Sequence, residues 1–222
     1  MTTKLNTALF LSSLACTGLI QAAFLSDAQA NGFTLAYVVF GFLAIVMLYA
    51  LARIGLAAFQ DLEPLTVPAW QSWAVPLLAL AGLGVAGYLT YVETQMVAAI
   101  CGPVGDCNAV QSSVYARMFG VLPVALLGIG GYVAILLAWG WGHFRQDRLA
   151  RLVGPALYAM AFLGVLYSLY LTYLELYVIK AVCMWCISSA IIMALLLFLS
   201  VKPMLNFLSA DEDDDRAAAL ET

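Results

Sequence analysis

The chain has 222 residues, of which 64% are hydrophobic and only 10% are charged. An ordinary globular domain has about 45–50% apolar and about 25% charged residues, so this composition predicts an integral membrane protein. With 9 basic residues, 13 acidic residues and a formal net charge of −4, the chain lacks the basic surface that nucleic-acid binding requires, and this function is excluded.

Six segments are apolar enough to form membrane-spanning helices, which need about 20 mainly apolar residues to cross about 30 Å of hydrocarbon. The first also fits a cleavable secretory signal, because Lys4 precedes a short apolar stretch and the triplet Ala28-Gln29-Ala30 follows it. Its single thiol, Cys16, is interpreted as an ordinary buried cysteine. The predicted spans are Leu5–Leu25, Phe33–Phe59, Trp73–Ala99, Gly120–Trp141, Leu152–Ile179 and Val182–Leu199.

The placement of lysine and arginine predicts the orientation, because these residues are enriched in cytoplasmic loops. Alternating the spans with Lys4 inside puts seven of the nine basic residues on the cytoplasmic side and only Arg117 and Lys180 outside. The acidic run Asp211–Asp215 then lies in the cytoplasm, where we expect a solvated, disordered tail.

A short motif occurs twice. The stretch Tyr88–Glu93 (YLTYVE) recurs as Tyr170–Glu175 (YLTYLE), and in both copies the glutamate precedes a cysteine, Cys101 or Cys183, by eight residues. We therefore predict two similar helical hairpins related by an axis along the membrane normal. The predicted fold is an all-α integral membrane protein, in which these parallel-repeat hairpins form a four-helix bundle with one or two extra N-terminal helices.

Both close cysteine pairs fall on the outer side, where disulfides form and persist. Cys183 and Cys186 form a C-x-x-C at the start of a span, where the helix N-terminus favours the thiolate, so a redox-active pair is the natural use. A zinc site is one alternative, but Cys101 and Cys107 are spaced more widely than zinc ligands usually are, and the only histidine, His143, lies on the inner side. We expect no metal. Two inert structural disulfides are the other alternative.

The two pairs differ in their surroundings. Cys101 and Cys107 are separated by Gly-Pro-Val-Gly-Asp, which predicts a bendable loop that gives the access that thiol–disulfide exchange requires. We expect this pair to be mobile and exposed to water, and the pair Cys183/Cys186 to be fixed on a helix at the membrane edge.

Four features in this order carry a family resemblance: the loop cysteine pair, the stretch Asn108–Ala116 (NAVQSSVYA), the stretch Gly120–Gly128 (GVLPVALLG) that opens a span, and C-x-x-C-x-x-S at 183–189. Together they resemble the bacterial form of the vitamin K epoxide reductase family. The resemblance implies a bacterial inner-membrane protein whose core, residues 73–201, is a four-helix bundle around a quinone of the ubiquinone or menaquinone (vitamin K) type. Outside this core lie residues 1–30, 31–72 and an acidic tail, 202–222; the outer cysteine loop spans 96–119.

The resemblance also implies a route for electrons. A thioredoxin-like partner would reduce the loop pair at Cys101, Cys107 would pass electrons to Cys183, and Cys186 would lie against the quinone ring, so that disulfides are generated in exported proteins. Ser113 matches a family position that helps to keep the loop in place.

Two departures from the family pattern limit what is carried over. Many bacterial members have a fused thioredoxin-like domain; no such domain is evident here, so a separate periplasmic or extracellular partner is expected. Ala190 stands where the animal enzymes have a tyrosine that contacts vitamin K, so epoxide reduction and anticoagulant sensitivity are not implied. With Trp185 and Ser189, Ala190 is a candidate lining residue of the quinone pocket.

Glu93 and Glu175 are the charged residues about two turns below the cysteines, and they could relay protons or be plain boundary carboxylates. A transporter is the main rival from another class, because parallel repeats also occur there, but transporters place ionisable groups at mid-membrane. The quinone-linked disulfide-forming protein of the bacterial periplasm has a similar bundle, but its C-x-x-C precedes the spaced pair.

Overall fold

The computed structural model describes residues 31–57, 67, 69–101, 105–118 and 122–220, and the first predicted span, Leu5–Leu25, lies outside them. Five helices in this part are long and apolar enough to cross a membrane. The elements are a first helix, Asn31–Ala57, then α2 (Ala69–Gln95), α3 (Cys107–Gln111), η1 (Val114–Ala116), β1 (Arg117–Met118), β2 (Leu122–Pro123), α4 (Val124–Phe144), α5 (Arg148–Arg151), α6 (Val153–Tyr173), η2 (Leu174–Ile179) and α7 (Met184–Leu220).

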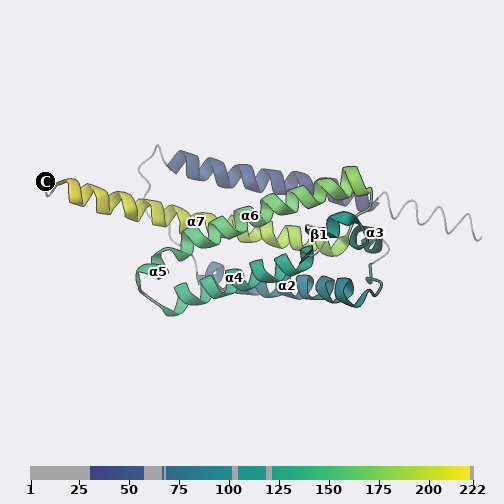
Figure 1. Ribbon diagram of the computed structural model, residues 1–222. Coiled ribbons are helices and arrows are strands. Elements are labelled where there is room, and N and C mark those ends of the chain that lie inside the picture. The colour runs from purple at the N-terminus through teal and green to yellow at the C-terminus, as the bar shows by residue number, and fades with distance from the viewer. Residues whose placement is uncertain (1–30, 58–66, 68, 102–104, 119–121, 221–222) are drawn as a thin grey trace, which may run out of the picture.

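The four long helices α2, α4, α6 and α7 form the predicted bundle (Figure 1). α2 packs on α4 and α7, and α6 packs on α7 and α4, so each hairpin contacts the other. The short elements α3, η1 and the two-residue strands gather at one end of the bundle, and α5 lies at the opposite end. The prediction of an all-α membrane bundle is confirmed.

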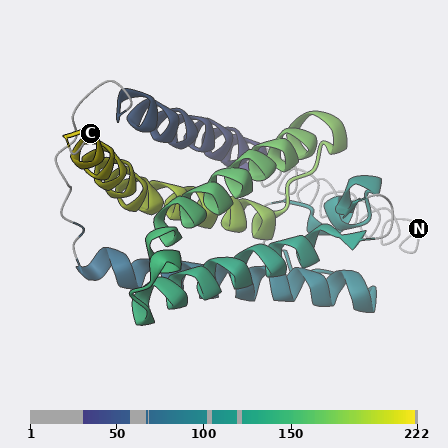
Figure 2. The ribbon, with the colours of Figure 1, turned by 60° about the vertical axis from the view of Figure 1, so that its left-hand side comes forward.

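The helix Asn31–Ala57 lies along the outside of α6 and α7 (Figure 2). Its ring contacts fit this position, since Tyr37 meets Tyr177 at 6.2 Å and Tyr49 meets Phe198 at 5.6 Å. One face is buried at a spacing of three and four residues, the pattern of a coiled-coil seam. The buried residues of this face are Ala36, Val39, Leu43, Val46, Ala50 and Ala57. The helix is therefore an integral part of the packed bundle.

The two sequence repeats form matching structures. Thr90 and Thr172 each donate a side-chain hydrogen bond to the carbonyl four residues earlier, at 2.8 Å in both cases. Just beyond the two helix ends, Met96 and Lys180 adopt left-handed backbone conformations with φ of 54° and 57°. The internal duplication is thus visible in local geometry as well as in sequence.

One expectation about the C-terminal part is wrong. The sequence predicts a last span that ends at Leu199 and a disordered acidic tail, but α7 continues as one helix to Leu220. After Pro203 the sequence contains neither glycine nor proline, so nothing in it interrupts propagation of a helix that is already nucleated and packed in the bundle.

Gly82 lets two helices approach closely. A Cβ at this position would overlap the ring of Tyr132, which is fully buried and whose hydroxyl lies 2.8 Å from the Ser189 hydroxyl. We expect Gly82→Ala to destabilise the protein by about 1–3 kcal/mol, the usual cost of overpacking. Gly84→Ala, two residues away on a surface with open space, should not destabilise it. Thermal unfolding in detergent measures both, and equal midpoints would contradict the packing argument.

Candidate functional site

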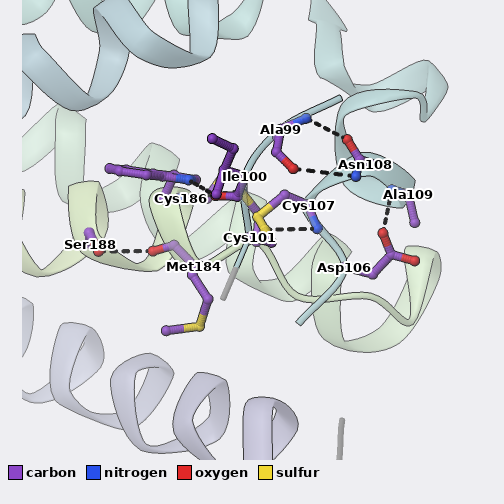
Figure 3. The surroundings of a disulfide bond; sticks show 12 residues. Ala99, Ile100, Cys101, Asp106, Cys107, Asn108, Ala109, Met184, Cys186 and Ser188 are labelled. Carbon is purple, nitrogen blue, oxygen red and sulfur yellow. Dashed lines mark hydrogen bonds between the residues drawn. A yellow bond between two sulfur atoms is a disulfide. The ribbon is translucent and has the colours of Figure 1, made fainter. Parts of the chain in front are cut away.

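The loop cysteines form a disulfide at the end of the bundle opposite α5. Cys101 and Cys107 are bonded with a Cα–Cα distance of 5.9 Å, and the backbone N–H of Cys107 donates to the Cys101 sulfur at 3.2 Å (Figure 3). Asp106 caps the short helix α3, because its side chain accepts a hydrogen bond from the N–H of Ala109 at 3.0 Å. The sequence places the second loop cysteine at the first position of a capped helix.

This disulfide is held against the second cysteine pair. The N–H of Asp106 donates to the carbonyl of Val182 at 2.9 Å, directly before Cys183. On the other side of the disulfide, Asn108 accepts a hydrogen bond from the N–H of Ala99 at 2.7 Å (Figure 3). The expectation of a mobile, water-exposed pair is wrong for Cys107, which is fully buried, because these two hydrogen bonds fasten both flanks of the loop.

Trp185 contributes to the same attachment. Its indole N–H donates to the carbonyl of Ile100 at 3.0 Å, and its ring lies 4.6 Å from that of Tyr88. The Tyr88 hydroxyl accepts from the N–H of Ile100 at 2.8 Å. Trp185 therefore ties the C-x-x-C segment to the residue before Cys101.

Cys183 and Cys186 are both free thiols, one at the residue before α7 and the other in its first turn. Cys183 is fully buried in the same apolar cluster as Cys107. A hydrogen bond from the Cys186 thiol lowers the pKa of Cys183, and backbone N–H groups and the Gln111 side chain act in the same direction. In the reduced pair, Cys183 is therefore the favoured thiolate and Cys186 the proton donor.

Glu175 lies directly beside this pair. It is only 2% exposed, and its carboxylate accepts a hydrogen bond from the N–H of Cys183 at 3.2 Å. Its side chain is also hydrogen-bonded to the Cys186 thiol. No hydrogen bond joins the repeat-related Glu93 to a cysteine in the described part of the chain; the charged group that acts on it is Arg117.

A cavity of about 410 Å³ opens between the four bundle helices below the cysteines. This volume is within the range of small-molecule sites, about 300–1,000 Å³. Of the residues selected from the sequence, six line it, and Trp185 is not among them. These six are Glu93, Ser113, Glu175, Cys186, Ser189 and Ala190.

Polar atoms without partners lie in this mainly apolar cavity. The buried oxygens Glu93 Oε2, Gln111 Oε1 and Ser113 Oγ have no hydrogen-bond partner within the protein. Buried polar groups are almost always satisfied, so such atoms indicate a place where a polar ligand atom is accommodated. The cavity thus combines an apolar wall with a few hydrogen-bonding groups at its cysteine end.

The family model described as "Vitamin K epoxide reductase family" matches residues 73–201. The chain belongs to this family. Membership identifies it as a membrane oxidoreductase, and the five candidate spans make it a multi-pass membrane protein. The matched region of the vitamin K epoxide reductase family contains the four cysteines of the two pairs and every lining residue of the large cavity, and the helix Asn31–Ala57 lies outside it.

Gln111 is the member of this vitamin K epoxide reductase site that sequence reasoning missed. Its side chain reaches both Cys183 and the cavity. The sequence gives only a weak indication that Gln111 belongs to the site: it is a single polar residue before Ser112 and Ser113 in a mainly apolar chain. Among the described residues, no group of three or more His, Cys, Asp or Glu side chains could hold a metal ion.

Proposed function

We propose that this protein is a quinone-dependent thiol oxidase that takes electrons from a thioredoxin-like partner and thereby generates disulfides in exported proteins. Electrons pass from the partner to Cys101/Cys107, then to Cys183/Cys186, then to a quinone in the cavity. The observation that carries the proposal is the continuity of the site: Cys107 and Cys183 share one buried cluster, and Cys186 lines the cavity.

The exposures of the four cysteines support this order. Cys101 is half-buried and Cys107 fully buried, so a partner thiolate attacks Cys101 and releases Cys107 as the thiolate. Cys107 then attacks Cys183 in the inner disulfide. The second thiolate of the partner's dithiol then attacks the mixed disulfide with Cys101, which releases the oxidised partner and frees the Cys101 thiolate. Attack by Cys101 on Cys107 in the Cys107–Cys183 bond completes the exchange and leaves an oxidised loop with a reduced inner pair, which is the state described by the structure.

The cavity residues fit a quinone. A bound quinone would accept two electrons and two protons from the dithiol. The Ser113 hydroxyl can donate to a quinone carbonyl oxygen, and the unpartnered Gln111 Oε1 can accept from a hydroxyl group of the quinol product. Cys186 is the cysteine that lines this space, whereas Cys183 faces the loop.

The first test measures the reaction. Protein in lipid nanodiscs, supplied with a soluble dithiol, should reduce ubiquinone or menaquinone analogues, followed by the loss of quinone absorbance. Cys107→Ser should abolish this activity because the relay is interrupted. Cys16→Ser, which changes the one cysteine outside both pairs, should retain it. A Cys107→Ser variant with full activity would show that the loop pair is a structural disulfide.

The proposed setting is the bacterial inner membrane, with the cysteines on the periplasmic side. α4 is 21 residues long, about 31 Å at 1.5 Å per residue, so it places the cysteine end and the α5 end on opposite sides of the hydrocarbon. Arg145, Arg148 and Arg151 are at the α5 end, which the positive-inside rule assigns to the cytoplasm.

Labelling of intact cells tests this orientation. After mild reduction, a membrane-impermeant maleimide should label Cys101. A new cysteine at Arg148, introduced where all native cysteines are changed to serine, should stay unlabelled until the cells are permeabilised. Labelling of the Arg148 position from outside would reverse the proposed topology.

A further inference from the structure

Glu175 lies in a distorted part of the fold. Residues Leu174–Ile179 form a π-helix, η2, that continues α6, whereas the corresponding end of α2 in the first repeat is regular α-helix. Single π-turns that interrupt an α-helix are frequent at functional sites. Here the π-helix contains a carboxyl group that is 2% exposed and lines the cavity beside the cysteines.

The contacts of Glu175 reach both cysteines of the C-x-x-C. Its Oε2 accepts from the N–H of Cys183 at 3.2 Å, and its side chain is hydrogen-bonded to the Cys186 thiol. Glu175 forms no ion pair with any other described residue, and the hydrogen bonds of its carboxyl group are with the two cysteines.

Glu93 gives an internal comparison. It occupies the same position of the repeated motif and lines the same cavity, but one of its carboxyl oxygens has no protein partner. The two repeats have therefore diverged: both glutamates line the cavity, but only the second is hydrogen-bonded to the cysteines.

We propose that Glu175 is the proton donor and acceptor for the Cys186 sulfur during exchange between the two cysteine pairs. The inference rests on the proposed function, in which the Cys107 thiolate attacks the Cys183 sulfur. In that step the Cys107–Cys183 bond forms, the Cys183–Cys186 bond breaks, and its electron pair leaves on Cys186. The Glu175 carboxyl group protonates this thiolate and becomes the carboxylate.

The state reached when the whole exchange is complete, after Cys101 has attacked Cys107 and released Cys183, agrees with the contacts described. The Cys186 thiol can then donate to the Cys183 thiolate, while the Glu175 carboxylate remains beside Cys186 to accept the proton again when the pair is reoxidised. Rapid protonation of the leaving sulfur makes the reverse attack of Cys186 on the mixed disulfide slower, so transfer proceeds towards the inner pair.

The experiment uses full-length, quinone-free protein in nanodiscs with both disulfides oxidised. A soluble dithiol is added, and samples are quenched with acid, alkylated and analysed by mass spectrometry to time the reduction of each pair. We expect Glu175→Gln to slow reduction of Cys183–Cys186 about 100-fold, the lower range for loss of a general acid. Reduction of Cys101–Cys107 should keep its wild-type rate.

Three comparisons decide the result. The amide oxygen introduced by Glu175→Gln can still accept the hydrogen bond from Cys183, so this variant removes the proton and keeps the geometry. Glu175→Asp should recover the rate to within about tenfold of wild type, because it restores a general acid. Asp147→Asn makes the same acid-to-amide change at the cap of α5, at the opposite end of the bundle (Figure 1), and should leave inter-pair exchange within about threefold.

An unchanged exchange rate in E175Q, or an E175D variant as slow as E175Q, would overturn the proton-transfer role. Failure of the proposed function would give a different result. Reduction of Cys183–Cys186 in the wild-type protein would then not depend on the loop pair, and the Cys183–Cys186 disulfide of the Cys107→Ser variant would be reduced at the wild-type rate.

Discussion

A Cys186→Ala variant should accumulate a disulfide between Cys107 and Cys183 and lose quinone-dependent turnover on the order of 1000-fold or more, as expected when a reacting thiol is removed. Without Cys186, the Cys183 thiolate can still attack Cys107 in the loop disulfide. The Cys107–Cys183 bond forms, the Cys101–Cys107 bond breaks, and Cys101 is left as a free thiol. Burial of Cys107 and Cys183 in one cluster favours this product.

Proteolytic mapping under non-reducing conditions, combined with alkylation of free thiols, measures the link directly. Cys183→Ala is the matched control, because it removes the attacking sulfur and should leave the Cys101–Cys107 disulfide intact. If the Cys186→Ala protein contained only Cys101–Cys107 and retained turnover, the two pairs would be independent and the relay would be wrong.

Gly105→Ala should uncouple the two cysteine pairs. Gly105 has a φ of +107°, which side chains rarely adopt, and a Cβ there would lie 2.5 Å from the carbonyl oxygen of Val182. That carbonyl accepts the Asp106 hydrogen bond that docks the loop. Relief of the clash requires undocking, so we expect transfer from Cys107 to Cys183 to slow about 100-fold, equivalent to about 2.7 kcal/mol.

The same quench and mass-spectrometric assay separates this effect from general damage. In G105A the soluble dithiol should still reduce Cys101–Cys107 at least as fast as in wild type, because the loop becomes more accessible. Gly84→Ala, which adds a methyl group where space is open, should exchange normally. Wild-type transfer in G105A would mean that the docked conformation is not the one in which exchange occurs.

Much of the bundle could be predicted because its signals are strong in sequence. Long apolar segments have few structural alternatives in a membrane, and the repeated YLTYxE motif with its fixed distance to Cys101 and Cys183 predicted two equivalent hairpins. The tail after Leu199 could not be predicted in the same way. Its acidic composition favours disorder, but continuity with a packed helix prevails over composition.

The seam of the helix Asn31–Ala57 was not predicted for a different reason. Lipid-facing and protein-facing surfaces of this span are both apolar, so the periodicity that marks a buried face in a soluble protein has little contrast here. Val39 is buried and Val38 is exposed, yet their chemistry is identical.

The details of the site depend on backbone geometry that the sequence does not specify locally. The bond from Asp106 to Val182 joins segments about 75 residues apart, and no local sequence pattern marks the π-turn at Glu175. Sequence therefore predicted which cysteines and glutamates belong together, but not that Glu175 alone contacts the cysteines, nor that Gln111 joins them.

The position of the helix Asn31–Ala57 restricts where a lipid-soluble molecule can reach the cavity. This helix covers the flank formed by α6 and α7, so lipid chains have little access there (Figure 2). On the other side, the cavity walls include Leu127 of α4 and Leu163 of α6, which are 37% and 63% exposed. For the quinone proposed above, the seam between α4 and α6 is therefore the side on which a long isoprenoid chain would leave the cavity and extend into the bilayer.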